Sequence, residues 1–311
     1  MTPEEQRRGT AYAFLAYGIW GLFPLYFAAL APAGAFEILA HRILWTLLFC
    51  LVVLVARRDL AWVRPALRAR RLVGGVTAAG LLIGTNWVIY VWAVLSGLTY
   101  EAALGYFLNP IVTVGLGVLV LRERLRTWQW VAVGVGLVAA AYLAVAGGGF
   151  PWIAVSLALT FGAYGLVKKR VGATLQAMHS LAAETTVLAP IAAVILAVVT
   201  ARGESTLVGH GGGHTTLLLV AGVVTAVPLL LFAASARRIP LVTIGLIQFL
   251  TPVLQLLCGV FLLGEHVSPR LWVGFGIVWV ALVILTVDSV LAARSGRVGT
   301  PIAEPEAAGA D

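Results

Sequence analysis

Three ionisable side chains stand close together in FEILAHRILW, residues 36–45. Glu37 and His41 are four residues apart, and Arg42 follows directly. Residues four apart share one face of a helix, so the carboxylate and the imidazole would lie side by side. Either group could exchange protons there, beside a fixed positive charge. The setting is unusual for such chemistry, because the neighbouring residues are almost all apolar.

The composition is that of a membrane protein. Hydrophobic residues make up 61% of the 311 residues and charged residues only 11%, whereas soluble domains carry about 25% charged residues. The mean hydropathy is +0.99. A helix needs about 20 apolar residues to cross a bilayer, so the chain has room for about ten spans and no sizeable soluble domain. The lipid bilayer is therefore its expected partner.

Long apolar runs recur along the chain and predict an all-α integral membrane protein with ten transmembrane helices. The runs are continuous, unlike the alternating segments of about ten residues that form membrane barrels. The first run exceeds the apolar core of a cleaved signal, so we expect it to remain as a span. The predicted spans are residues 10–31, 36–56, 72–95, 100–121, 128–146, 150–168, 180–200, 215–236, 240–263 and 270–292.

The basic residues predict the orientation. Of the 21 Lys and Arg residues, Arg42 lies within a span, Arg202 and Arg270 fall on one side, and the other 18 share the side of the N-terminus. Basic loops stay in the cytoplasm, so residues 1–9 and the acid- and Pro-rich tail 293–311 are predicted to be cytoplasmic, the tail disordered. Because the charges are split among short loops, nucleic-acid binding is not expected.

An internal repeat organises the chain. Residues 106–143 align without gaps on residues 248–285, and 13 of the 38 positions are identical. This predicts two duplicated five-helix units at 10–146 and 147–292. The telling identities are Pro110/Pro252, Gly117/Gly259, Glu123/Glu265, Trp130/Trp272 and Gly134/Gly276.

An odd number of spans forces the second unit to enter the membrane upside down. Inverted repeats are typical of secondary transporters, in which one unit adopts two conformations that exchange roles. A channel or another membrane role is the alternative. The inversion predicts Glu123 at the cytoplasmic surface and Glu265 at the opposite one.

Two Pro residues mark the predicted substrate path. Asn109-Pro110 and Thr251-Pro252 occupy matching positions, each about ten residues or 15 Å into its helix. Pro frees backbone carbonyls and can break or bend a spanning helix near a binding site. Simple helix packing is the alternative. The candidate path residues here are Tyr106, Asn109, Gln248 and Thr251, with Pro110 and Pro252 as helix breaks.

Arg42 would lie about 9 Å into the bilayer, where an unpaired guanidinium costs a few kcal/mol. It should therefore point inward and line the path together with Glu37 and His41. Alternatively, Arg42 reaches the headgroups and pairs with Glu37 at the surface. Gly80 and Gly84 predict a close helix contact. Further candidates for the path are Trp20, Asn86, Trp87, Tyr90 and Glu184.

Other chemistry finds little support. His210 and His214 in GHGGGH have a metal-like spacing, but two ligands in a Gly-rich loop do not make a closed site. Cys50 and Cys258 fall inside spans and suit packing. A phosphate-binding loop of the Gly-x4-Gly-Lys-Ser/Thr type is missing from the sequence. We expect no metal, no cofactor and no catalytic residue; a membrane-embedded lipid-handling enzyme, using His41 with Glu37, is the alternative.

Several segments carry a family likeness: YGIWGLFPLYF (17–27), EILAHRILW (37–45), NWVIYVWAV (86–94), EAALGYFLNPIVTVGLGVLVLRERL (101–125), VPLLLFAASARRIPL (227–241) and QFLTP (248–252). With them the chain resembles the EamA-type members of the drug/metabolite transporter superfamily, in particular the RarD subfamily. The likeness implies two EamA repeats in the bacterial inner membrane that move small metabolites or drugs, often outward. It supplies no substrate.

The combined expectation is a secondary transporter that works by alternating access and exports a small molecule, with a proton as a candidate coupling ion. The two repeats differ at Gly264-Glu265-His266, which replaces Arg122-Glu123-Arg124. This indicates that Glu123 and Glu265 act at helix ends and do not bind substrate. The oligomeric state is left open.

Overall fold

The computed structural model describes residues 3–121, 126–146, 150–172, 174–236, 238–239 and 247–294, and every regular element in these ranges is helical. The first half contains α1 Pro3–Gly21, α2 Phe23–Ala29, α3 Ala35–Ala56, α4 Val63–Arg68, α5 Arg70–Leu95, α6 Thr99–Leu121 and α7 Thr127–Ala146. The second half contains α8 Trp152–Gly172, α9 Ala177–Ala201, α10 Gly212–Ala236, α12 Leu250–Leu257, the π-helical η1 Cys258–Leu262 and α13 Pro269–Arg294.

Length and apolar composition qualify six helices as membrane spans. The first is α1 together with α2, which continues it. The other five are α3, α5, α9, α10 and α13. Shorter apolar helices at Thr127–Leu143, Trp152–Lys168 and Leu250–Leu262 add to the same bundle. The protein is therefore a multi-pass helical membrane protein, although this criterion establishes six of the ten predicted spans.

The helices pack in a pattern that repeats itself. If α1, α3, α5, α6 and α7 correspond to α8, α9, α10, α12 and α13, the main contacts map onto one another. Helix α3 packs on α9, α6 on α12 and α7 on α13, each with its own counterpart. The contacts α5–α8, α6–α8 and α3–α10 correspond to α10–α1, α12–α1 and α9–α5. The bundle therefore has an approximate two-fold relation between its halves.

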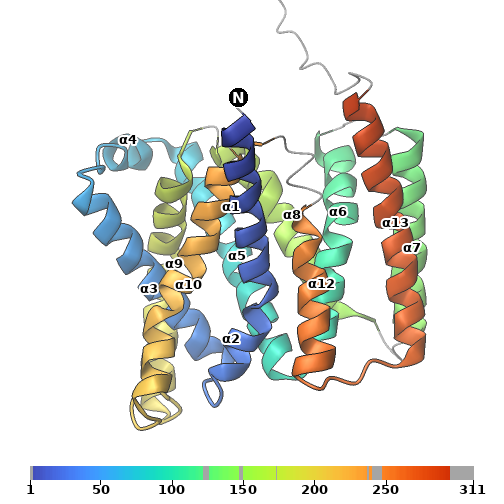
Figure 1. Ribbon diagram of the computed structural model, residues 1–311. Helices are drawn as coiled ribbons and strands as arrows, with labels where there is room; N and C mark the ends of the chain where they lie inside the picture. Colours follow the sequence, from blue (N-terminus) through green and yellow to red (C-terminus); the bar gives the residue numbers. More distant parts are fainter. Residues whose placement is uncertain are drawn as a thin grey trace, which may run out of the picture.

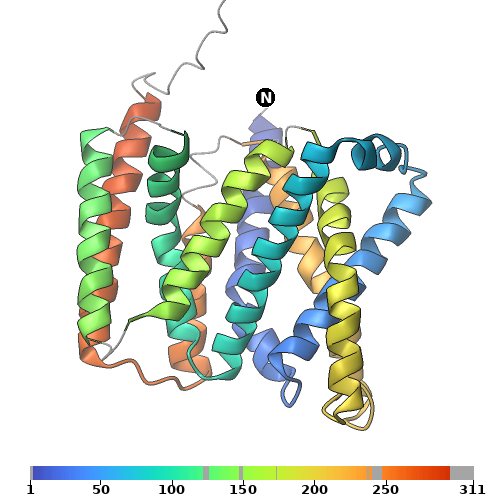
Figure 2. The ribbon, with the colours of Figure 1, turned by 180° about the vertical axis from the view of Figure 1, so that it is seen from behind.

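The chain runs in opposite directions through the two halves. Helix α1 starts at the end of the bundle marked N, whereas its counterpart α8 finishes there (Figures 1 and 2). The last turn of α13 lies at that same end (Figure 1). We call this the N-terminal end and the other the far end. Helices α7 and α13 form one flank, and α3, α9 and α10 form the other.

Small residues allow the closest helix contacts. A Cβ atom at Gly80 would lie 3.2 Å from the carbonyl oxygen of Glu184, and one at Gly84 would lie 3.3 Å from the Leu188 side chain. The close contact predicted for these two glycines is thus confirmed, between α5 and α9. Gly105 of α6 meets the backbone of Ala154 in α8 in the same way. Lipid tails are as apolar as the helix surfaces, so the hydrophobic effect does not drive membrane helices together, and close packing of this kind contributes to their association instead.

The backbone at the Pro residues and at one helix end can be compared with the predicted spans. Helix α6 runs through residue 110 without interruption, and the Pro110 side chain lies outside the described residues. Helix α9 likewise continues through Pro190. Helix α12 begins at Leu250, two residues before Pro252. Helix α8 extends past residue 168 to Gly172, which places Lys168 inside the helix.

Candidate functional site

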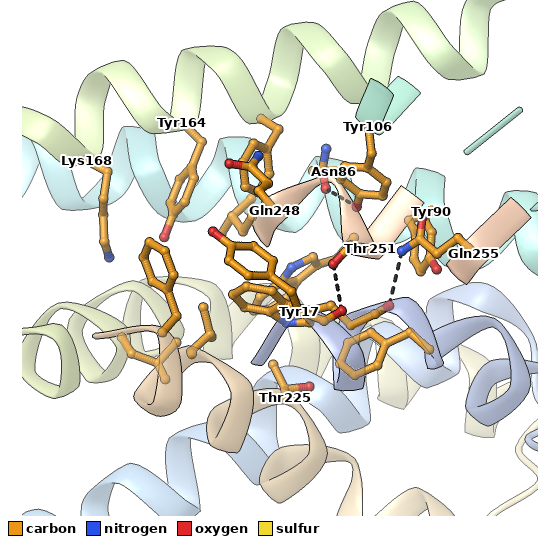
Figure 3. A pocket seen from close by; sticks show the side chains of 18 of the residues that line it. Tyr17, Asn86, Tyr90, Tyr106, Tyr164, Lys168, Thr225, Gln248, Thr251 and Gln255 are labelled. Carbon is orange, nitrogen blue, oxygen red and sulfur yellow. Dashed lines mark hydrogen bonds between the residues drawn. The ribbon is translucent and has the colours of Figure 1, made fainter. Parts of the chain in front are cut away.

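A cavity of about 300 Å³ lies between the two halves. Five helices of the first half, α1, α2, α3, α5 and α6, and four of the second, α8, α9, α10 and α12, contribute to its wall. Aromatic side chains dominate it, and Figure 3 shows several of them facing one another across the space. They are Tyr17, Trp20, Phe23, Trp87, Tyr90, Tyr106, Phe161, Tyr164, Phe232 and Phe249.

The cavity reaches toward the N-terminal end. Ala177, the first residue of α9, belongs to its lining. On the other side, its deepest residues include Arg42 and Tyr106. Each lies seven residues inside its helix from the far end, which corresponds to about 10 Å of helical rise. Protein therefore separates the cavity from the far end.

Arg42 of α3 is the charged group at the inner part of this cavity. Only 2% of the residue is exposed. Its Nε donates to the Thr225 hydroxyl of α10 at 3.1 Å, and its guanidinium carbon lies 4.5 Å from the ring centroid of Trp87 and 5.0 Å from that of Phe27. Among the described residues, its Nη1 has no hydrogen-bond partner and no carboxylate forms an ion pair with it. Arg42 thus lines the cavity and makes no surface pair with Glu37.

These contacts leave the Arg42 charge largely uncompensated. A cation over an aromatic face gains about 0.5–2 kcal/mol, and one neutral hydrogen bond contributes about 1 kcal/mol. Removing an ion from water costs several kcal/mol even after the protein relaxes. The desolvation cost of Arg42 therefore exceeds these gains, and a bound anion would reduce the difference.

The second charged group in the cavity is an ion pair. Lys168 of α8 binds Glu184 of α9, which is 2% exposed. The Glu184 carboxylate also accepts from the Ser180 hydroxyl at 2.7 Å and from the Tyr164 hydroxyl at 3.3 Å. Lys168 additionally donates to the Ser180 hydroxyl at 2.7 Å. The two charges therefore cancel locally, close to the end of α8 at Gly172 and so near the N-terminal end.

Uncharged polar side chains tie the cavity wall together. Asn86 Nδ2 donates to the Leu157 carbonyl at 3.0 Å, and the Tyr106 hydroxyl donates to Asn86 Oδ1 at 3.3 Å. Thr251 donates to the Tyr17 carbonyl at 2.7 Å, and Gln255 Nε2 to the Trp20 carbonyl at 3.2 Å (Figure 3). Among described groups, the hydroxyl of Tyr90 and Oε1 of Gln255 find no partner. With Nη1 of Arg42, they are the buried polar atoms of the described lining that have no partner.

Most of the predicted path residues meet at this cavity. Trp20, Arg42, Asn86, Trp87, Tyr90, Tyr106, Glu184, Gln248, Thr251 and Pro252 line it. The residues predicted with them that do not line it are Glu37, His41 and Asn109. Asn109 is buried, with 3% exposed.

Glu37 is occupied elsewhere, in the connection between α9 and α10 at the far end. Its carboxylate accepts from the Ser205 hydroxyl at 3.0 Å, from the Thr206 amide at 2.7 Å and from the Thr206 hydroxyl at 2.9 Å. His41 Nδ1 accepts from the Trp45 indole at 3.0 Å. Sequence spacing put these groups beside Arg42, but they lie on a different side of α3 from the cavity.

Glu265 also acts at the far end. Its two carboxylate oxygens accept the backbone N–H groups of Thr99 and Tyr100, at 2.8 and 2.9 Å, and so cap the first turn of α6. A Cβ atom at Gly259 would lie 2.7 Å from Glu265 Oε2, so Gly259 leaves room for this carboxylate. Glu265 sits at a helix end, outside the cavity lining.

Sequence reasoning missed several lining residues. Lys168 ends the predicted span 150–168 and counts there only as a basic residue of the cytoplasmic side, yet Tyr164 and Lys168 are four apart on one helix face. Gln255 follows Thr251 by the same interval. Thr225 carried no signal, since a single Thr in an apolar helix is common. Helical spacing from the predicted residue Thr251 finds Gln255, whereas no predicted path residue lies on α8 from which Tyr164 and Lys168 could be reached.

The described residues hold no group of three or more His, Cys, Asp or Glu side chains that could bind a metal. The rings of His210 and His214 lie 5.6 Å apart at the far end.

Comparisons with known proteins agree with the repeat and the fold. The EamA-like transporter family matches residues 7–145 and again residues 150–287. Protein RarD of Streptomyces exfoliatus is 46% identical over 97% of this chain and 95% of its own length. The uncharacterized transporter YojE of Bacillus subtilis (strain 168) is 39% identical over 96% of this chain and 99% of its own. A solved crystal structure, 18% identical, superimposes with a TM-score of 0.58 over 91% of this chain and 98% of its own, and supports the fold alone.

Proposed function

Because the chain belongs to the EamA-like transporter family, and within the drug/metabolite transporter superfamily to the RarD subfamily, it is a multi-pass membrane transporter, and we propose that it carries a small molecule through the cavity by alternating access. One observation carries the proposal: helices from both inverted halves enclose the cavity, so neither half forms it alone. Inverted halves can exchange conformations and so move the opening from one side to the other.

The described conformation corresponds to one side of that cycle. The cavity lining extends to the first residue of α9 at the N-terminal end, while Glu37 and Glu265 bind loop and helix-end groups at the far end. Arg57, Arg70 and Arg71 end α3 or begin α5 at the N-terminal end, as basic residues do on the cytoplasmic side. We infer an inward-facing state, ten spans, and both termini in the cytoplasm of a bacterial inner membrane.

The same geometry supports export as the direction of transport and indicates a candidate group for proton coupling. An exporter must load substrate from the cytoplasm, and an inward-facing cavity of this kind permits that. Glu184 is the one carboxylate among the described lining residues, so it is the group through which a proton would couple. Its ion pair with Lys168 would have to open for that exchange.

Filling the cavity tests the path. We expect purified protein in proteoliposomes to show counterflow of at least one solute from a panel of amino acids, drugs and nucleosides. Leu229→Trp places a large ring in the lining and should reduce that counterflow roughly tenfold or more, by overpacking the space. Val280→Trp is the matched control, because Val280 is 54% exposed on the lipid-facing surface of α13. Equal transport by both variants would place the path elsewhere.

The enzyme alternative lacks its reacting pair. A lipid-handling enzyme would need His41 to act with Glu37, but the Glu37 oxygens accept from Ser205 and Thr206, and His41 Nδ1 accepts from Trp45. Neither side chain lines the cavity. The named relatives are transporters, which favours the same conclusion.

A further inference from the structure

We propose that the substrate is an organic anion with an apolar, ring-sized body, and that Arg42 binds its anionic group; this rests on the proposed function, since it names the substrate class of the same cavity. The first support is the charge of the lining. Its ionisable cationic and acidic side chains are Arg42, Lys168 and Glu184. Lys168 and Glu184 neutralise each other, so one positive charge remains.

The second support is a pair of buried hydrogen-bond donors without partners. Nη1 of Arg42 and the hydroxyl of Tyr90 are both buried without a partner among the described residues. Both side chains pack on Phe27: the guanidinium carbon lies 5.0 Å and the Tyr90 ring centroid 5.8 Å from the Phe27 ring centroid. A carboxylate only accepts hydrogen bonds and offers about four lone pairs, so it can satisfy both donors together.

The third support is the character of the remaining wall. Tyr17, Trp20 and Phe232 form one aromatic cluster, with ring centroids 5.3 to 6.0 Å apart. Trp87 lies against Arg42 itself. Such a wall favours an apolar body of similar shape and would discriminate poorly among hydrophilic solutes.

Other substrate classes fit less well. A cation would have to sit beside an uncompensated guanidinium, at a cost in repulsion. A neutral molecule would leave the Arg42 charge uncompensated. If Arg42 only held α3 to α10 through Thr225, a neutral donor would make the same bond without the cost of a buried charge and of an Nη1 group that has no partner among the described residues.

Matched probe sets test the charge requirement on the full-length protein in detergent. Each set has one body and three end groups: 3-phenylpropionate, 3-phenylpropionamide and 3-phenylpropylammonium, with equivalent sets built on an indolyl and on a branched-alkyl body. Binding is measured from the rise in thermal unfolding midpoint with ligand concentration. We expect at least one acid to bind roughly tenfold or more tightly than its amide, and no amine to bind better than its amide.

Variants then assign the charge to Arg42. Arg42→Gln should remove the preference for acid over amide, and Arg42→Lys should keep part of it, because Lys retains the charge without the planar fork. Arg270→Gln, at the exposed start of α13, is the control and should bind as the wild type does. Sodium chloride is tested separately: if chloride alone protects as well as the acids do, the site is an inorganic anion site and the proposal is wrong.

The proposal is also overturned if no acid binds better than its amide, or if Arg42→Gln retains the preference. The wild-type comparison needs no variant, so it remains decisive even if Arg42→Gln does not fold. Uptake into proteoliposomes separates the two proposals. Acids that bind through Arg42 but are not transported would contradict the proposed function alone, whereas transport of an uncharged solute without acid binding would contradict the anion proposal alone.

Discussion

Buried charge has different surroundings in the cavity and at the far end. At the far end, Glu37 and Glu265 are 1% and 9% exposed, and each carboxylate accepts two or three hydrogen bonds from protein groups. In the cavity, Arg42 is 2% exposed and has an open donor. A charge satisfied by the chain stabilises a connection, whereas a charge left open is available to a ligand. Burial alone does not distinguish the two.

The largest expected effect comes from comparing neutral substitutions of Arg42 in the cavity and Glu37 at the far end. Arg42→Gln should lower the rate of transport at limiting solute concentration roughly tenfold or more, because it removes the charge-assisted contact. Glu37→Gln keeps one acceptor oxygen and should leave the half-saturation concentration within about twofold. Proteoliposome uptake over a range of solute concentrations measures both.

The Glu37 result is the sharper half of this pair. If Glu37→Gln raised the half-saturation concentration as much as Arg42→Gln did, the far end would bind substrate and the distinction would collapse. A change in maximal rate alone would not do so, because Glu37 holds the connection after α9 and that connection must move during transport.

A smaller effect should come from the ion pair in the cavity. Glu184→Gln leaves Lys168 without its carboxylate and should lower the free energy of unfolding by about 1–3 kcal/mol. This is less than for a fully buried pair, since Lys168 is 29% exposed and water screens part of its charge. Thermal unfolding of the purified protein in detergent reports the loss.

The double variant Lys168→Gln/Glu184→Gln distinguishes charge from packing. It removes both charges at once and should recover most of the stability lost by Glu184→Gln, because no unpaired charge remains. A double variant that is less stable than the single one would show that the two side chains contribute through shape and hydrogen bonds. Lys168 and Glu184 would then have a structural role like that of Glu37 and Glu265 at the far end.

The spans were the most predictable part of the structure. Long apolar runs must form helices in a bilayer because their backbone groups have no other partner there. Helices α3, α5 and α10 accordingly begin or end within a few residues of the predicted runs. The end of α8 was placed too early, since Lys168 counted only as a basic residue of the cytoplasmic side until its partner Glu184 was known.

The site could be predicted only in part. Arg42, Asn86 and Tyr106 stood out because polar groups are costly inside a membrane. Their neighbours Glu37 and His41 stood out for the same reason, and helical spacing alone does not reveal that Glu37 meets Thr206, which is 169 residues away in the chain. Which face of a helix meets the cavity is decided by the packing of helices distant in sequence.

The smallest expected effect concerns the cap that Glu265 places on α6. A methyl group at Gly259 would push the Glu265 carboxylate away from the amides of Thr99 and Tyr100, so Gly259→Ala should cost about 1 kcal/mol through the lost cap. Gly276→Ala is the matched control: nothing lies within 4 Å of its Cβ position, and replacing a helical Gly should gain up to about 1 kcal/mol.

Amide hydrogen exchange over residues 97–104 reads the cap directly. Gly259→Ala should speed exchange at Thr99 and Tyr100, and Gly276→Ala should not. Because both changes act through one contact, Gly259→Ala combined with Glu265→Ala should cost no more than Glu265→Ala alone. Fully additive losses would mean that Gly259 is needed for some other packing, and that the far-end carboxylate does not depend on the space beside it. In that case the loop before α13 would hold the Glu265 carboxylate in position, whereas Arg42 would still be positioned by the helices around it.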